Sequence, residues 1–379
     1  MQKTDVSIDL AGKLIDDFLA RTGISSPVGE PRQRYLWTDA FAVQACFALS
    51  HLLENDEYLA HARRLIESVH EVLGRFRPDD ERQGWLSGLP EDEGKKFPTR
   101  GGLRIGKDLP ERKPGEPVDQ MKEWERDGQY FHYLTRWFNT LMQAAAEFQE
   151  PAYAHHAAGL IRAGEAFLQQ RDGQYRMVWK MNTDLTKPAV ESMGTHDPLE
   201  GLVCTIRALH SATTNKSALQ ELKSKFENSC TDMNWFTDDS LGVGGLLLNC
   251  TRGFEFRRKE IEIPDCIQPE RLLLDSLTGL RIFSEDIFNP QQPAEARLAF
   301  RECGLSLGMN VLLGFPDDYK SFKVNVSKLE KYLPLVNEIE GFWMQEENRQ
   351  QKSWTSHKDI NAVTLACSLL ARDYPGAFI

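Results

Sequence analysis

Residues 124–137, with the sequence WERDGQYFHYLTRW, mark the point where a long irregular segment turns into a helix. This stretch places acids, a histidine and aromatic residues at the helix start, ahead of an apolar run with small residues. Four other stretches repeat the arrangement: residues 37–39 (WTD), 194–201 (GTHDPLEG), 235–239 (WFTDD) and 354–359 (WTSHKD). We interpret the five stretches as the rim of one site.

The whole chain is predicted to be helical, because it shows no sustained alternation of apolar and polar residues with a period of two. Twelve segments are predicted as helices. They are residues 5–22, 38–54, 56–75, 127–149, 151–170, 197–212, 216–229, 239–253, 268–284, 293–314, 322–340 and 356–372.

The predicted helices are of two kinds. Those with one apolar stripe and one charged face are typical of helices exposed on one side, and they include 5–22, 56–75, 216–229 and 322–340. Those that are apolar nearly all round and rich in small residues are typical of buried helices, and they include 38–54, 197–212, 239–253 and 356–372. We interpret their cysteines as small core residues. The alternation predicts antiparallel hairpins with one helix inside and one outside.

Six such hairpins close into a ring if the first helix, 5–22, packs against the last inner helix, 356–372. This pattern resembles the (α/α)6 toroid of the six-hairpin glycosidase-like superfamily, which also contains N-acylglucosamine 2-epimerase-like enzymes. The resemblance covers essentially the whole chain, so we expect residues 1–379 to form one all-α toroid domain. A rival all-α fold is an open superhelix, but no repeat of fixed length is visible.

The resemblance also implies where a substrate binds. In such a toroid the inner helices run the same way, so their N-termini meet at one mouth. Unpaired N–H groups and the positive dipole ends there suit hydroxyl-rich or anionic ligands. The resemblance implies that catalytic carboxylates or histidines lie on the same rim.

Composition limits the classes of partner. The chain has 379 residues and a net charge of −11, which argues against nucleic acid or an anionic membrane as a partner. No apolar run approaches the roughly 20 residues that a membrane span needs, and the N-terminal residues lack the pattern of an export signal. Seven cysteines without a CxxC pair are typical of reduced thiols. We therefore expect a cytoplasmic protein that acts on a small-molecule carbohydrate, neutral or anionic, in an oligomeric state that the sequence leaves open.

No cofactor and no metal ion are expected. The sequence contains no Walker or Rossmann spacing, which a nucleotide site would need. It also lacks zincin spacing and paired CxxC ligands.

The helix starts supply candidate catalytic groups, because glycoside hydrolysis needs one protonated carboxyl and one ionised carboxylate. A helix dipole lowers the pKa of an acid at a helix start. Four acids therefore suit the ionised role: Asp39, Asp127, Asp238 and Asp239. The adjacent Asp238-Asp239 pair also resembles the paired aspartates of α-1,6-mannanase-type toroids. Glu200, one turn into its helix, suits the drier, protonated role.

Capping is the structural alternative for these acids. In the sequence Asp197-Pro198-Leu199-Glu200, Asp197 is predicted as an N-cap and Glu200 as the N3 acid of a capping box. Ser356 and Asp359 have the same spacing, and Thr38 and Thr237 are ordinary predicted N-caps.

Three histidines join the acids at these starts, although capping does not require them. An epimerase would use two bases on opposite faces of a ring-opened sugar, and His196 and His357 are the natural pair. A non-catalytic sugar-binding toroid is the third alternative. The predicted catalytic set is Asp39, Asp127, His132, His196, Asp197, Glu200, Asp238, Asp239 and His357.

Residues 76–123 form the longest predicted connection, which its length indicates to be either functional or disordered. Its centre, residues 97–107 (FPTRGGLRIGK), could fold over the mouth as a lid and offer Arg104 or Lys107 to an anionic group. A solvated surface loop is the alternative. Aromatic side chains at the rim commonly stack on sugar rings. The predicted substrate-binding set is Trp37, Trp124, Tyr130, Arg104, Lys107, Trp179 and Asp359.

Overall fold

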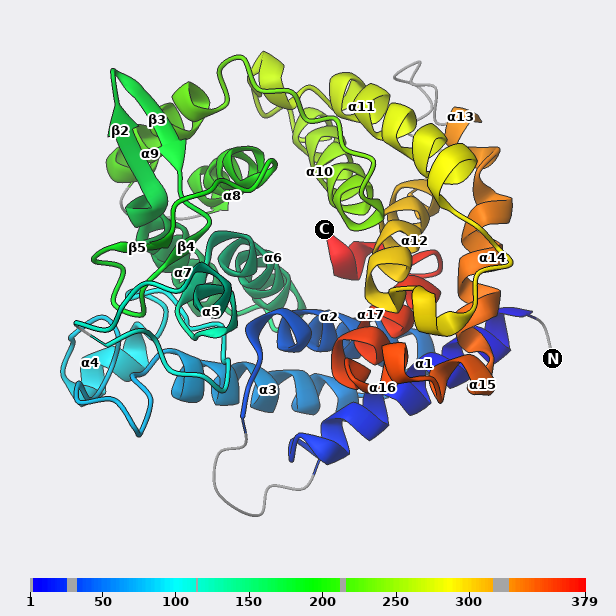
Figure 1. Cartoon of the computed structure of the whole chain (residues 1–379), viewed down its shortest axis with the longest axis horizontal. Coiled ribbons are helices and arrows are strands. Elements are labelled where there is room, and N and C mark those ends of the chain that lie inside the picture. Colours follow the sequence, from blue (N-terminus) through cyan, green and yellow to red (C-terminus); the bar gives the residue numbers. More distant parts are fainter. Residues whose placement is uncertain (1–2, 26–32, 114, 212–215, 316–326) are drawn as a thin grey trace. The chain divides into compact units, whose positions relative to one another are not determined.

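A computed structural model describes residues 3–25, 33–113, 115–211, 216–315 and 327–379. These residues form mainly α-helices, with five short strands among them (Figure 1). The all-α class predicted from the sequence is therefore confirmed.

The described residues divide into two compact units. The first contains the described parts of Met1–Pro27, Phe41–Ala62 and Asn234–Ile379, and the second those of Val28–Ala40 and Arg63–Met233. The boundary falls inside two helices, α2 (Leu36–Leu53) and α3 (Glu57–Leu73).

The first unit packs three apolar helices beside one another, α10 (Ser240–Arg258), α12 (Ala299–Gly314) and α17 (Lys358–Ala371). Each also packs against a more exposed helix: α11 (Pro269–Ile282), α14 (Leu333–Met344) and α1 (Lys3–Arg21), respectively. The contact of α1 with α17 is the predicted pairing of the first helix with the last inner helix. Short helices complete the unit: α13 (Ser327–Glu330), α15 (Glu346–Arg349) and α16 (Lys352–Thr355).

Glycines allow the close approach of α10 and α12. A Cβ atom at Gly244 would lie 2.2 Å from the carbonyl oxygen of Gly304, and one at Gly308 would lie 2.4 Å from that of Gly244. No side chain fits at these distances, so the small residues noted in the apolar segments bring the two helix backbones together.

The second unit contains two consecutive helical hairpins, α6 (Phe131–Glu147) with α7 (Pro151–Ala163), and α8 (Asp197–Ser211) with α9 (Lys216–Ser229). Helix α6 also packs against α8. At Gly201 on α8 a Cβ atom would lie 2.3 Å from the ring of Phe226 on α9, so this glycine lets the ring pack on the helix backbone.

Two small sheets lie in the second unit. Strands β1 (Gln129–Tyr130), β4 (Lys180–Met181) and β5 (Pro188–Val190) form an antiparallel sheet in that order, with Tyr130 opposite Lys180. Strands β2 (Leu168–Arg171) and β3 (Gln174–Met177) form a hairpin. Its two turn residues, Asp172 and Gly173, have φ angles of 51° and 80°, as a type I′ turn requires.

Most predicted segments match helices to within a few residues, and the main errors have local causes. Helix α6 begins at Phe131 rather than at 127, because the preceding residues join strand β1. The predicted segment 151–170 ends at Ala163 and continues into a 3₁₀ turn and strand β2. Segment 293–314 begins at Ala299, and 322–340 holds α13 and α14, with residues 322–326 outside the described part.

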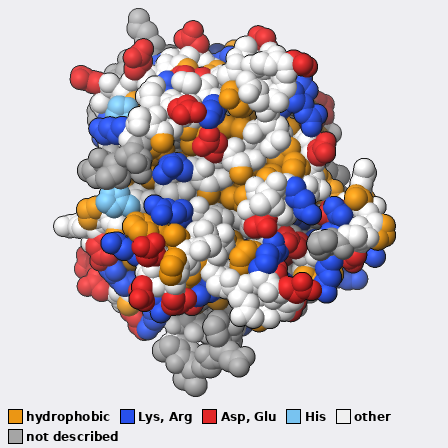
Figure 2. All heavy atoms as spheres, turned by 90° about the vertical axis from the view of Figure 1, so that its left-hand side faces the viewer, with side chains coloured by type: hydrophobic (Ala, Val, Ile, Leu, Met, Phe, Trp, Pro, Cys, Tyr) orange, Lys and Arg blue, Asp and Glu red, His pale blue; other side chains and the backbone are white. Residues whose placement is uncertain are grey.

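Helix α2 is apolar and long. By length and composition α2 could span a membrane, but 83% of its 18-residue window is buried, as in a core helix; it is the one such helix in the described ranges. We predicted this segment, 38–54, from the sequence as a buried apolar helix. On the face drawn in Figure 2, acidic and basic side chains are interspersed with hydrophobic ones.

Residues 76–123 contain the short helices α4 (Glu91–Lys96) and α5 (Gln120–Glu125) and are otherwise irregular, but they are packed. Leu103 and Ile105 are fully buried. The buried Asp127 carboxylate accepts hydrogen bonds from the Arg104 guanidinium (2.5 Å) and from the backbone N–H groups of Gly106 and Gly128 (3.0 Å each). The centre of this segment is therefore part of the protein interior, and the alternative of a solvated loop is wrong for it.

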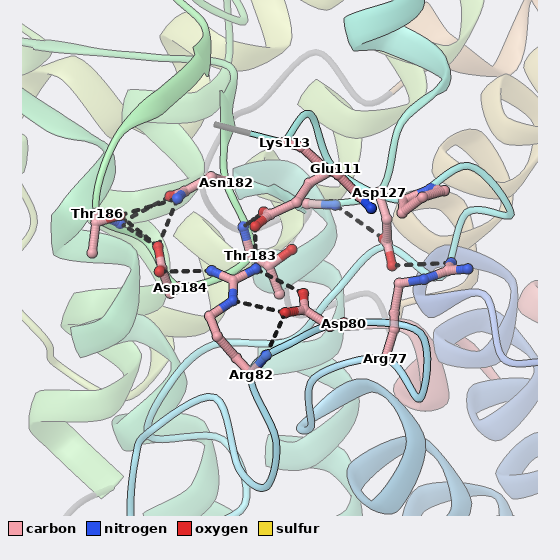
Figure 3. A network of polar contacts seen from close by, with 12 residues as sticks. Arg77, Asp80, Arg82, Glu111, Lys113, Asp127, Asn182, Thr183, Asp184 and Thr186 are labelled. Atoms are coloured by element: carbon pink, nitrogen blue, oxygen red, sulfur yellow. Dashed lines mark hydrogen bonds and ion pairs between the residues drawn. The ribbon is translucent and has the colours of Figure 1, made fainter. Parts of the chain in front are cut away.

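An arginine joins this long segment to the connection that follows β4. The Arg82 guanidinium donates two hydrogen bonds to Asp80, one of 2.8 Å to Asp184 and one to Glu111 (Figure 3). Glu111 in turn accepts a hydrogen bond of 2.6 Å from the backbone N–H of Thr183. Three stretches far apart in sequence therefore meet at one cation.

We predict that Arg82→Ala loosens residues 76–123, because three carboxylates that share one cation would then repel one another. Limited proteolysis should cut this segment faster in the variant than in the parent protein. Arg100→Ala, which removes an exposed arginine of the same segment, is the control and should leave the rate unchanged. Equal cleavage of Arg82→Ala and the control would show that the Arg82 network does not hold the segment.

Candidate active site

Three of the five predicted rim stretches lie in the second unit: the starts of α2, α6 and α8. Aromatic and ionic contacts join them. The ring centroids of Trp37 and His132 are 5.9 Å apart, and the Arg136 guanidinium on α6 is 3.0 Å from the Glu200 carboxylate on α8. The other two stretches, at α10 and α17, belong to the first unit. The site described below is therefore that of the second unit.

Glu200 is held by helix α6. Its Oε2 accepts a hydrogen bond of 2.5 Å from the Thr135 hydroxyl, and its Oε1 accepts one of 3.0 Å from Nη2 of Arg136. The residue is only 6% exposed. A cation and a hydroxyl donor that both point at one carboxylate stabilise its ionised form.

Asp197 lies one turn earlier on the same helix and has the opposite environment. It is 4% exposed, and its Oδ2 has no hydrogen-bond partner among the described residues. Burial, and then the negative charge of Glu200, raise the pKa of Asp197 to about 8. Burial and the charge of Glu200 therefore favour a protonated Asp197, whereas the donors from α6 favour an ionised Glu200.

Gly194 makes room for the Asp197 carboxyl group. A Cβ atom at Gly194 would lie 2.5 Å from Oδ2 and 2.9 Å from Oδ1 of Asp197. A side chain at position 194 would therefore displace the Asp197 carboxyl group. Within the motif 194–201, Gly194 contributes this space and Asp197 and Glu200 contribute the polar groups.

The two acids do not form the capping box that we predicted. Asp197 was predicted as an N-cap, but α8 already begins at Asp197, which makes Asp197 the first helical residue and Pro198 the second. The Glu200 carboxylate is engaged by α6 rather than completing a capping box. Glu200 was predicted as the protonated group, whereas burial favours a proton on Asp197.

His132 lies beside this pair, with aromatic rings on several sides. Its ring stacks on Tyr130 at 5.3 Å and meets Tyr133 and Trp179 edge-on at 4.8 and 5.9 Å. Burial lowers the pKa of His132 to about 4, and the Arg136 cation adds to this while Glu200 opposes it. The imidazole is neutral at pH 7, and its nitrogens make no hydrogen bond with any residue that the structure describes, which leaves one donor and one acceptor for a ligand.

Two partly exposed tryptophans stand next to His132. Trp124 on α5 and Trp179 meet edge-to-face, with ring centroids 5.4 Å apart. Tyr130 lies close to both groups, and its hydroxyl donates to the carbonyl oxygen of Trp124 at 3.2 Å. Rings of this kind, exposed on one side, can stack on the apolar faces of a sugar.

Two lysines hold α5 beside these rings. Lys107 donates to the carbonyl of Trp124, and the buried Lys180 donates to the carbonyls of Glu123 and Arg126 at 2.5 Å each. Burial, with the neighbouring Lys107 charge, lowers the pKa of Lys180 to about 8. Because both amino groups bind carbonyls at the end of α5, they stabilise that helix end.

The two cations predicted to bind an anionic substrate are thus engaged in the fold. Lys107 binds α5, and Arg104 is buried with all three of its nitrogens donating, to Asp127 and to the carbonyls of Arg75 and Val72. Neither prediction as a substrate ligand is supported by these contacts.

The remaining predicted acids serve helix starts or the fold. Asp39 accepts a hydrogen bond of 3.1 Å from the backbone N–H of Tyr35 and lies 3.7 Å from Arg34. Asp239 caps α10 by accepting from the N–H of Gly242 at 2.9 Å, and it pairs with Arg301.

Several predicted caps are displaced along the chain. Asp239, not Thr237, is the N-cap of α10, and α2 begins at Leu36, so Thr38 lies inside it. The N-cap position of α17 is His357, not Ser356, and its ring makes no capping bond. Asp238 is exposed.

The two histidines of the predicted epimerase pair belong to different units. His196 precedes α8 in the second unit, whereas His357 is an exposed residue of the first. Asp359, predicted to bind substrate, forms an ion pair with Arg21 of α1. In the first unit Asp359 therefore joins α17 to α1.

The sequence prediction missed Thr135, Arg136 and the hydroxyl pair of Tyr35 and Tyr133, whose oxygens are 2.7 Å apart. A usable signal was present. Arg136 lies one turn after His132 in a helix that is otherwise apolar on its buried side, and a charge in such a place is expected to have a partner.

No group of three or more His, Cys, Asp or Glu side chains that could hold a metal ion occurs in the described ranges. Comparison with known proteins adds no name to this site: no family model, no curated protein and no solved structure matches the chain.

We predict that Asp197→Asn changes how stability depends on pH. Because the folded-state pKa is about 8 and the usual value is 3.8, the wild-type protein is most stable below about pH 4 and loses stability as the pH rises towards 8. The variant lacks this loss, so its free energy of unfolding relative to wild type should increase by up to about 1.4 kcal/mol per pH unit over this interval. Denaturant unfolding at pH 5, 6.5 and 8 measures it.

Glu221→Gln, at an exposed acid on α9, is the matched control for this measurement. A constant difference between wild type and Asp197→Asn across the three pH values would show that Asp197 is ionised in the folded protein.

Proposed function

We propose that this chain is a carbohydrate-active enzyme that hydrolyses glycosides, with its site at the start of α8. The observation that carries the proposal is the pair of carboxyl groups whose surroundings favour opposite protonation, with Asp197 protonated and Glu200 ionised. Glycoside hydrolysis needs such a pair, and environments that drive two acids apart are typical of acid and base assignments.

In this proposal each group of the site has one task. Asp197 donates its proton to the leaving-group oxygen. If Glu200 acts as base, it takes a proton from the attacking water, and the pair is reset by proton exchange with solvent. If Glu200 acts as nucleophile, it forms a glycosyl ester that water cleaves, and the Asp197 carboxylate takes the proton of that water and is protonated again. The exposed faces of Trp124 and Trp179 hold a sugar ring, and the neutral His132 ring binds a hydroxyl group. The low exposure of both acids limits water at the reacting bond.

We further propose that the fold is the (α/α)6 toroid of the six-hairpin glycosidase-like superfamily. The support lies within the units: hairpins α6/α7 and α8/α9 in one, and the apolar helices α10, α12 and α17 in the other, each with an outer partner. A cytoplasmic location is part of this proposal, and its support is that all seven cysteines are free thiols.

A sugar epimerase or isomerase is the second candidate, because of one observation. The neutral imidazole of His132 makes no hydrogen bond with a described residue and feels the charge of Glu200, so it is a base near the acid pair, and a base with an acid can move a proton at a carbon next to a carbonyl. In this candidate His132 replaces the predicted pair of His196 and His357.

We predict that Asp197→Asn and Glu200→Gln each lower turnover by about 10²–10⁴-fold, the usual contribution of a positioned proton transfer, and leave ligand binding in place. Chromogenic glycosides and free sugars are the substrates, and Glu221→Gln is the control that keeps full activity. A hydrolase releases a new reducing end, whereas an epimerase incorporates solvent deuterium and loses activity in His132→Gln. A fully active Asp197→Asn protein would remove the acid from the mechanism.

A further inference from the structure

Arg136 on α6 lies between the Glu200 carboxylate and an indole ring. Its Nη2 donates to Glu200 at 3.0 Å, and its guanidinium carbon is 5.4 Å from the centre of the Trp37 ring. The side chain is 12% exposed and that of Glu200 8%. The ion pair is therefore shielded from water, and its geometry is fixed on the far side by the indole.

The side chain of Arg136 is directed at one acceptor. Its Nη2 donates to Glu200, and its Nε is buried without a partner, as is that of several other arginines of the protein, Arg126 among them. Arg104, by contrast, donates from Nε, Nη1 and Nη2 to carboxylate or carbonyl oxygens of three residues. The contact with Glu200 is therefore the polar contact through which Arg136 acts.

The surroundings of Glu200 indicate what this contact does. Asp197 lies three residues earlier on the same helix, where side chains are neighbours. Without a cation, a nearly buried Glu200 beside another acid would be driven towards its neutral form, and the difference between the two acids would be lost. The Thr135 hydroxyl also donates to Glu200, but it carries no charge.

We propose that Arg136 is a positioning residue that keeps the Glu200 carboxylate ionised and oriented, so that the proton of the acid pair resides on Asp197. This inference rests on the proposed function and adds to it the residue that sets the working pH range of the site. Arg136 acts through Glu200 and needs no contact with the substrate.

Two variants separate charge from shape. Arg136→Gln removes the charge and keeps a polar side chain, and Arg136→Lys keeps the charge on a smaller group. Arg162→Gln, at an exposed position on α7, is the matched control. The pH profile of turnover on a chromogenic glycoside is measured first. In Arg136→Gln the acid limb, which reports ionisation of Glu200, is expected to move up by about one pH unit or more. In Arg136→Lys and in the control it stays in place.

A second readout does not depend on turnover. The titration of His132 is followed by NMR on protein labelled at histidine, with its signal assigned through His132→Gln. If loss of the Arg136 charge also neutralises Glu200, the midpoint of His132 should fall from about 4, because the Glu200 charge raises the pKa of His132 more than Arg136 lowers it. A rise in the midpoint would show that Glu200 stays ionised without Arg136 and would overturn the inference. Arg136→Lys keeps the charge and should therefore show the wild-type midpoint of His132. If Arg136→Gln does not fold, Arg136→Lys still tests whether the charge sets this midpoint.

The outcomes are distinct. An acid limb and a His132 midpoint that both stay unchanged in Arg136→Gln, with turnover lowered equally at every pH, would overturn the inference and make Arg136 a packing residue. An Arg136→Lys protein whose acid limb moves despite the retained charge would overturn it as well. Absence of turnover in the parent protein on every glycoside contradicts the proposed function alone, since the histidine titration still decides the role of Arg136.

Discussion

Two carboxyl groups one helical turn apart in a nearly buried site cannot both carry a negative charge cheaply, and the candidate site depends on this constraint. The packing of α6 on α8 treats the two acids differently, because Thr135 and Arg136 of α6 both donate to Glu200. Asp197 is left with Gly194 beneath it and with an oxygen that no described residue binds. The asymmetry of the pair is therefore a property of tertiary packing, and the helix start alone does not produce it.

The aromatic part of the site depends on a segment without regular structure. Residues 76–123 are fixed by the buried Asp127, which gathers the turn around Gly106, and by Arg82, which ties the segment to the connection after β4. Trp179 directly precedes β4, and Trp124 lies on α5. Lys107 and Lys180 then hold the end of α5 through its carbonyl oxygens. Lys107, which we predicted to bind substrate, therefore helps to position the ring of Trp124 instead.

The sequence predicted the fold class better than it predicted the contacts of the site residues. Helix periodicity predicted the all-α class, because it follows from local pattern and burial. The contact of α1 with α17 was predicted from the ring of hairpins that the resemblance implies, and the structure contains this contact. The β2–β3 hairpin was missed although Asp172-Gly173 is a strong turn signal. The environments of Asp197 and Glu200 in the motif 194–201 differ from those predicted, since the distance of an acid from the helix start does not reveal which donors a second helix will bring. Asp127 shows the same limit, because its oxygens are taken by groups of residues 104–106 that no motif links to it. Asp39 and Asp239 instead bind backbone N–H groups close to them in sequence, as the capping alternative predicts.

The protonation state of Asp197 is the central claim, and it can be observed directly. Infrared difference spectra of the folded protein, recorded from pH 5 to pH 10 for wild type and for Asp197→Asn, isolate the carbonyl stretch of a protonated carboxyl group at this position. We predict a band that is present in wild type at pH 7, disappears with a midpoint near pH 8, and is missing from the variant. A wild-type spectrum at pH 7 without that band, or a band that persists in Asp197→Asn, would contradict the account.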